Sequence, residues 1–143
     1  MSTTRSDRLR DLYEAFDFRS AAEGKLDRLF ESHLRSDFEL HPPPIYPDAG
    51  IYRGLEEVRD FFRMLTDVWG EWRIEPERMT EAGDRTVVLV RLHARGRESG
   101  AKTETSAAHL WDFDGDLAAR LEVFVDPDDA LAAAGLRDLQ SPP

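Results

Sequence analysis

The chain has 143 residues, a usual length for one domain, and 41% of them are hydrophobic, which is enough for a buried core. Lys and Arg number 19 against 29 Asp and Glu, so the formal net charge of −10 argues against nucleic-acid or anionic-membrane partners. Cysteine is absent, which excludes disulfides, thiol nucleophiles and cysteine metal sites.

The composition predicts a single domain over residues 1–143, with residues 1–6 and 138–143 frayed. The polar first residues lack the apolar run that is typical of a signal peptide. No stretch approaches the roughly 18 apolar residues of a membrane span. We therefore expect a cytoplasmic protein with no membrane partner.

Three helices are expected in the first half of the chain. Two of them have one apolar face each, formed by Leu9, Leu12, Tyr13 and Phe16 and by Leu26, Leu29, Phe30 and Leu34. Ser20 and Glu23 have the spacing of a capping box for the second helix. The third helix covers residues 55–69, with Phe62 on its apolar stripe, and Gly70 ends it.

Strands alternate with turns through the rest of the chain. Residues 38–41 predict a short strand before three prolines, and residues 72–79 predict another, in which Pro76 requires an edge position or a bulge. Strands over residues 86–92, 103–113 and 117–125 follow, with Asp114-Gly115 as the turn between the last two. Asp126 and Pro127 begin a short C-terminal helix.

This order of elements predicts an α+β fold, in which helices pack on one face of a curved, mainly antiparallel sheet. Residues Val87–Val90 are apolar on both faces of their strand, whereas the helices are expected to cover only one. We therefore predict a homodimer through the outer sheet face. In the alternative, polar residues nearby, Thr86, Arg91, Arg95 and Arg97, keep that face compatible with a monomer.

Three segments, Tyr52–Val58, His109–Gly115 and Asp129–Leu136, carry a family resemblance. From about Leu9 to Leu136 the chain resembles the SnoaL-like branch of the nuclear-transport-factor-2-like superfamily, whose members are small bacterial proteins. The resemblance implies a cone: a strongly bent sheet around three N-terminal helices, with a mostly apolar pocket at the open end. Members include ketosteroid isomerases, limonene epoxide hydrolases, polyketide cyclases, dehydratases and non-catalytic modules, so the fold alone does not fix the chemistry.

His109 and Tyr13 are candidate catalytic residues. Strand alternation places His109 on one face with the side chains of Thr105, Ala107, Trp111 and Phe113, which we expect to point to the cavity. In the isomerase relatives, the resemblance implies that a carboxylic acid near His109 and a tyrosine of the first helix donate to the substrate oxyanion. In the alternative, His109 is a buried histidine satisfied by Tyr13 or by the backbone.

His41 is the third candidate catalytic residue. It precedes Pro42, in the position where isomerase relatives carry a proton-shuttling aspartate, and Glu39 shares its strand face. A carboxylate beside an imidazole can raise its pKa or hold one tautomer. In the alternative, His41 lies at the rim and hydrogen-bonds a loop carbonyl.

The other site residues are ligand-lining candidates. These are Glu39, Phe16, Trp111, Phe62 and Trp69. His93 is expected on the polar face and His33 at the surface, and Arg91-Leu92-His93 lacks the aspartate of the epoxide hydrolases. No histidine pair has metal-ligand spacing and no phosphate or dinucleotide motif occurs, so neither a metal nor a cofactor is expected.

These features predict a pocket for a small apolar or carbonyl-containing ligand. One hypothesis is a cofactor-free isomerase, dehydratase or cyclase, in which His41 moves a proton while His109 and Tyr13 polarise the substrate. The other is a non-catalytic ligand-binding or protein-interaction module of the same fold. Two imidazoles that face one cavity would favour the first hypothesis.

Overall fold

A computed structural model describes residues 4–43 and 50–135 of the chain. The helices are α1 (Arg5–Glu14), α2 (Phe18–Ala22), α3 (Lys25–His33), α4 (Gly54–Trp69) and α5 (Pro127–Ala133). The strands are β1 (Leu34–His41), β2 (Tyr52–Arg53), β3 (Glu71–Ala82), β4 (Arg85–Arg95), β5 (Lys102–Asp114) and β6 (Leu117–Phe124). No helix within the described ranges has the length and apolar character needed to span a bilayer.

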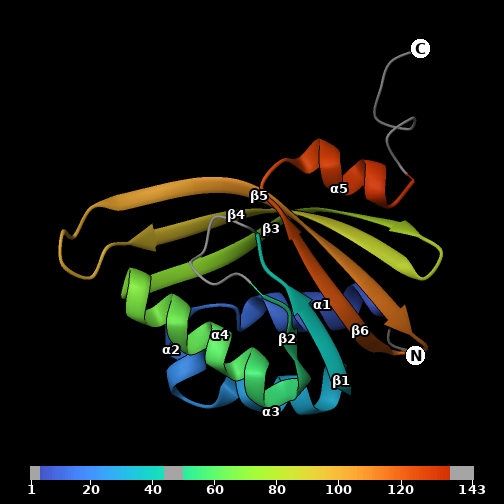
Figure 1. The fold of residues 1–143 in the computed structure, drawn as a ribbon, viewed down its shortest axis with the longest axis horizontal. Helices are drawn as coiled ribbons and strands as arrows, with labels where there is room; N and C mark the ends of the chain where they lie inside the picture. The colour runs from blue at the N-terminus through green and yellow to red at the C-terminus, as the bar shows by residue number, and fades with distance from the viewer. Residues whose placement is uncertain (1–3, 44–49, 136–143) are drawn as a thin grey trace.

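The strands form one mixed sheet of six strands in the order β2-β1-β6-β5-β4-β3. Strands β1 and β6 are parallel, and every other neighbouring pair is antiparallel. Figure 1 shows the curved sheet with α1 to α4 gathered on one side of it and α5 on the other. The main core lies between the four helices and the inner face of the sheet. The predicted α+β class and the curved sheet are therefore confirmed.

The N-terminal helices differ from the prediction at their boundaries. The expected capping box of Ser20 and Glu23 is wrong, because Asp17 caps α2 by accepting a hydrogen bond of 2.7 Å from the backbone N–H of Ser20. Gly24 then takes a φ of 78° and begins α3 as a separate helix. Leu34 belongs to β1 instead of the helix.

Most of the terminal residues that were predicted to fray lie outside the described ranges. Residues 1–3 and 138–143 are among those not described, but Arg5 and Ser6 belong to α1. The helix is capped by Thr4, whose side chain and backbone exchange hydrogen bonds with Asp7. Fraying at residues 5 and 6 is therefore not observed.

The edge strand β3 confirms the interpretation of Pro76. Strand β3 lies at one end of the sheet, and its register with β4 shifts between Pro76 and Arg78, so the strand has both an edge position and a bulge. The turn between β5 and β6 lies one residue later than predicted. Asp114 pairs with Leu117, which leaves Gly115 and Asp116 as the turn residues.

The outer face of the sheet has a cover that the sequence analysis did not assign. Helix α5 packs there through Ala130 and Leu131, against Val87, Ala108 and Leu110 of the sheet. The expectation that all helices cover one face is wrong, because α5 lies opposite the others (Figure 1). The apolar outer side of β4 is therefore partly covered by its own chain. A homodimer through this face stays a prediction.

Replacing Leu131 tests how much α5 contributes to stability. Leu131 is 6% exposed, so Leu131→Ala should lower the free energy of unfolding by about 2–5 kcal/mol through lost burial and a residual cavity. Leu117→Ala is the matched control, because Leu117 is 37% exposed and its truncation should cost less than about 1 kcal/mol. Urea denaturation of both variants measures the difference. Equal losses would show that α5 does not stabilise the sheet.

Candidate functional site

An apolar cavity of about 100 Å³ lies between α4 and the inner face of the sheet. Helix α4 contributes Phe61, Phe62 and Leu65, and most of the remaining wall is formed by aliphatic side chains of the strands. The cavity is smaller than the roughly 300–1,000 Å³ of a drug-sized site. An engineered apolar cavity of about 150 Å³ binds benzene, so a space of this order suits a compact molecule.

His109 is the only ionisable side chain among the described residues that line this cavity. It lies on β5 and is 5% exposed. Its Nδ1 atom is 2.6 Å from the hydroxyl oxygen of Tyr13, which comes from α1. The indole N–H of Trp111 donates to the same hydroxyl oxygen at 2.9 Å. Two strand residues and one helix residue therefore form a continuous buried hydrogen-bond chain.

Burial keeps the hydrogen-bonded side chains of His109 and Tyr13 uncharged. It lowers the pKa of His109 from 6.5 to about 3, so the imidazole is neutral near pH 7. Burial also raises the pKa of Tyr13 well above its ordinary range, an effect that the hydrogen bond from Trp111 only partly opposes. The sequence-based alternative, a buried histidine satisfied by Tyr13, is therefore confirmed.

His41 and Glu39 lie on the outer face of β1, away from the buried hydrogen bonds of Tyr13, His109 and Trp111. Phe38 and Leu40 are buried on the inner face, and Leu40 lines the cavity, so the residues that alternate with them point outward. The Nε2 atom of His41 is 3.0 Å from a carboxylate oxygen of Glu39. The expectation that His41 and His109 face one cavity is thus wrong, because the two imidazoles project from opposite faces of one sheet.

Glu39 is held in an ion-pair network on the outer face. Arg53 of the neighbouring strand β2 lies 3.4 Å from its second carboxylate oxygen. The hydrogen bond from His41 lowers the pKa of Glu39, and the nearby charge of Arg53 acts in the same direction. Glu39 therefore pairs with His41 and Arg53 on the outer face and does not line the inner cavity.

The aromatic lining candidates divide into two groups. Phe16 and Phe62 line the cavity, as expected. Neither Trp111 nor Trp69 lines the cavity. Trp111 is buried and hydrogen-bonded to Tyr13, and Trp69 is the half-buried last residue of α4. Trp111 nevertheless contributes to the site through its hydrogen bond to the Tyr13 hydroxyl.

Thr105 and Ser106 also line the cavity, and of the two only Thr105 was expected on the cavity face of its strand. Both are exposed residues of β5 that border the cavity. Thr105 shares the alternation of His109, which was a signal in the sequence. Ser106 lies out of that alternation, so no periodic pattern identifies it.

The other two histidines lie away from the cavity wall. His93 projects from the outer face of β4, where its Nε2 atom is 3.4 Å from Glu75. His33, at the end of α3, is 3.5 Å from a carboxylate oxygen of Asp11. Within residues 4–43 and 50–135, no group of His, Asp and Glu side chains is arranged to hold a metal ion.

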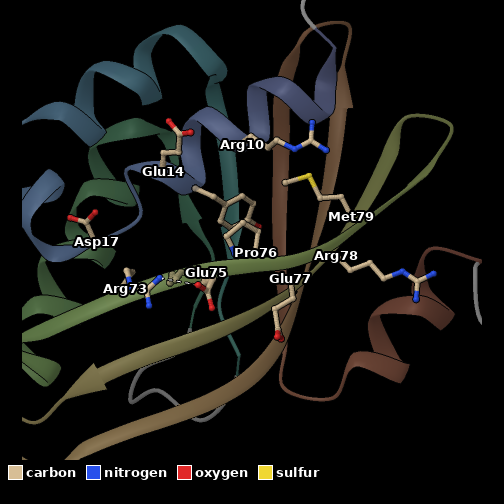
Figure 2. A pocket seen from close by; sticks show the side chains of 11 residues that line it. Arg10, Glu14, Asp17, Arg73, Glu75, Pro76, Glu77, Arg78 and Met79 are labelled. Atoms are coloured by element: carbon tan, nitrogen blue, oxygen red, sulfur yellow. Dashed lines mark hydrogen bonds and ion pairs between the residues drawn. The ribbon is translucent and has the colours of Figure 1, made fainter.

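A second hollow, of about 500 Å³, lies between α1 and the edge strand β3. Figure 2 shows its charged side chains pointing in different directions, with Glu14 and Asp17 above the strand and Glu77 below it. Arg73 pairs with Glu75 at 3.2 Å. Because the charges diverge or pair with one another, this hollow lacks the convergent groups of a binding site.

The comparisons with known proteins agree with this fold. Residues 9–121 match the SnoaL-like domain family, and the chain belongs to that family. An NTF2-like protein from Burkholderia thailandensis is 25% identical, with a TM-score of 0.72 over 94% of this chain and 98% of that one. No curated protein matches the sequence.

Two further solved structures show the same fold at lower identity. TerC, co-crystallised with polyporic acid, is 22% identical with a TM-score of 0.72, over 94% of this chain and 98% of that one. A Catenulispora acidiphila protein with a ketosteroid isomerase-like fold, in complex with trimethylamine, is 12% identical with a TM-score of 0.70. That match covers 97% of this chain and 100% of the other.

Removing the Tyr13 hydroxyl tests the hydrogen-bond chain. Tyr13→Phe leaves the indole N–H of Trp111 and Nδ1 of His109 without their partner, so it should lower the free energy of unfolding by about 1–3 kcal/mol. Tyr52→Phe is the matched control, because no hydrogen bond of its hydroxyl occurs within the described residues. It should change stability by less than about 0.5 kcal/mol in urea denaturation. Equal losses of stability in Tyr13→Phe and Tyr52→Phe would show that the buried hydrogen bonds of Tyr13 do not stabilise the fold.

The lowered pKa of His109 predicts a pH-dependent stability. The unfolded chain binds the proton near pH 6.5 and the folded chain only near pH 3, so stability is complete above pH 6.5 and decreases as the pH falls towards 3. Between about pH 6.5 and 5, the free energy of unfolding should fall more in the wild type than in His109→Gln, by up to about 1.4 kcal/mol per pH unit.

Urea denaturation at each pH measures this slope. His93→Gln is the control for losing an imidazole, since His93 lies on the outer face, and it should keep most of the wild-type slope. A His109→Gln variant with the same slope as the wild type would show that the buried imidazole is not the cause.

Proposed function

We propose that this protein binds a small, largely apolar molecule in the cavity beneath α4, with the His109 imidazole as the polar contact. The observation that carries the proposal is a buried, neutral imidazole at the wall of a mostly apolar cavity, whose other polar lining residues, Thr105 and Ser106, are exposed. Apolar walls supply affinity through burial, whereas a single polar group fixes the orientation of the ligand.

The same observations favour binding over acid–base catalysis. Proton transfer near pH 7 needs a group whose pKa lies close to that value, and burial holds His109 far below it. A second acid or base is not found among the described lining residues, because Glu39 and His41 project from the outer face. An isomerase, dehydratase or cyclase in this cavity would therefore rely on polarisation by His109, without the proton relay of His41.

Two of the similar structures support the expectation of an organic ligand, whereas the expected size rests on the cavity of this chain. TerC was co-crystallised with polyporic acid, and the Catenulispora acidiphila protein was solved with trimethylamine. Both are organic compounds found with proteins of this fold. The cavity here, at about 100 Å³, favours a compact molecule of roughly six heavy atoms.

Binding is tested with cyclopentanone and methylenecyclopentane, which have nearly the same shape. Binding to the folded state raises the melting temperature, and saturation at about 100 times the Kd adds roughly 2.7 kcal/mol of stability. Ala107→Leu should weaken binding of both probes at least tenfold, because Ala107 lines the cavity and a leucine would fill it.

Ala132→Leu is the matched control for this substitution. Ala132 is exposed on α5, so the same change there should leave binding intact. Nuclear magnetic resonance titration of the inner-face methyl groups reports the binding site directly. Failure of both probes to shift either the melting temperature or these methyl groups would overturn the proposed function.

A further inference from the structure

The hydrogen-bond chain behind the cavity has a defined order of donors and acceptors. An indole N–H can only donate, so Trp111 donates to the Tyr13 oxygen at 2.9 Å. The hydroxyl hydrogen of Tyr13 then needs an acceptor of its own. The one nitrogen or oxygen atom paired with this hydroxyl in the described residues, apart from Trp111, is Nδ1 of His109 at 2.6 Å. Tyr13 therefore donates to Nδ1.

The reverse arrangement leaves a buried donor without a partner. If Nδ1 carried the proton and donated to Tyr13, the hydroxyl hydrogen would point at no acceptor among the described residues. Tyr13 is 4% exposed, so water does not replace the missing acceptor readily. An unsatisfied buried donor is costly, which favours the order Trp111 to Tyr13 to His109.

This order places the histidine proton on the nitrogen that remains. A neutral imidazole carries one proton, so when Nδ1 accepts a hydrogen bond the proton lies on Nε2. The fully buried side-chain nitrogens that lack a partner in the described residues do not include Nε2 of His109. Because Nδ1 is paired with Tyr13 and the ring borders the cavity, Nε2 is the nitrogen left to present its N–H there.

We propose that Trp111 and Tyr13 are positioning residues that hold His109 as the Nε2–H tautomer, so that the cavity selects apolar molecules with a hydrogen-bond acceptor. The ligand class rests on the proposed function, whereas the tautomer rests on the buried chain alone. A ketone or ether oxygen satisfies the Nε2–H group. A hydrocarbon of the same shape leaves that donor desolvated and unpaired, which costs affinity.

The tautomer is measured without any ligand. In the full-length chain labelled with 15N-histidine, the His109 signals are assigned by their loss in His109→Gln. Between about pH 6 and 8, we expect Nε2 to carry the proton and Nδ1 to have the chemical shift of an unprotonated acceptor. A proton on Nδ1 in the wild type would overturn the inference directly.

Two variants test whether the chain sets this tautomer. Tyr13→Phe removes the donor to Nδ1, so the Nδ1–H form should become populated, whereas Tyr52→Phe should keep the wild-type signals. Trp111→Phe frees the Tyr13 oxygen to accept from His109, and should reduce the Nε2–H preference even if Tyr13→Phe fails to fold. An unchanged tautomer in the folded variants would show that these residues are not positioning it.

The ligand class is tested with the same two probes. Cyclopentanone should bind the wild type roughly two- to tenfold more tightly than methylenecyclopentane, the range that one net hydrogen bond supplies. In Tyr13→Phe this ratio should fall towards one. Equal binding in the wild type would overturn the selectivity. If neither probe binds, the proposed function fails, and the tautomer measurement alone decides the role of Tyr13 and Trp111.

Discussion

The hydroxyl group of Tyr13 fixes helix α1 to the inner face of the sheet. It is the one polar atom that joins α1 to both Trp111 and His109 of β5, in a region otherwise filled by apolar side chains. Apolar packing is tolerant of small shifts, whereas a hydrogen bond of 2.6 Å requires a defined distance and direction. The orientation of the His109 ring at the cavity wall therefore depends on this contact.

Hydrophobic periodicity predicted the elements that bury apolar side chains at a regular spacing. Helix α4 and strand β4 have clear apolar patterns, and both lie close to the predicted ranges. Helix α5 was placed on the wrong face, because its short apolar pair, Ala130 and Leu131, does not indicate which side of the sheet it meets. That choice depends on the path of the chain after β6, which local sequence does not encode.

The site was only partly predictable for a similar reason. Strand alternation found His109, and the helical face of α1 found Tyr13, so their contact follows from two independent patterns. His41 was selected by its position before Pro42, but the buried Leu40 shows that the strand parity places His41 outside. The alternation of inward and outward side chains is set by the whole strand. Here it decides the direction of His41, whereas the resemblance rested on the neighbouring Pro42 alone.

The irregular edge of β3 has a consequence for the behaviour of this protein at high concentration. Pro76 supplies no backbone donor, the bulge beside it breaks the even spacing of the strand, and the N–H of Ile74 is already taken by the carbonyl of Phe16 at 2.8 Å. A strand from another molecule would find no continuous ladder to extend at this point. The irregular edge at Pro76 thus opposes the addition of strands from other molecules, which is the step that extends a sheet into a fibril.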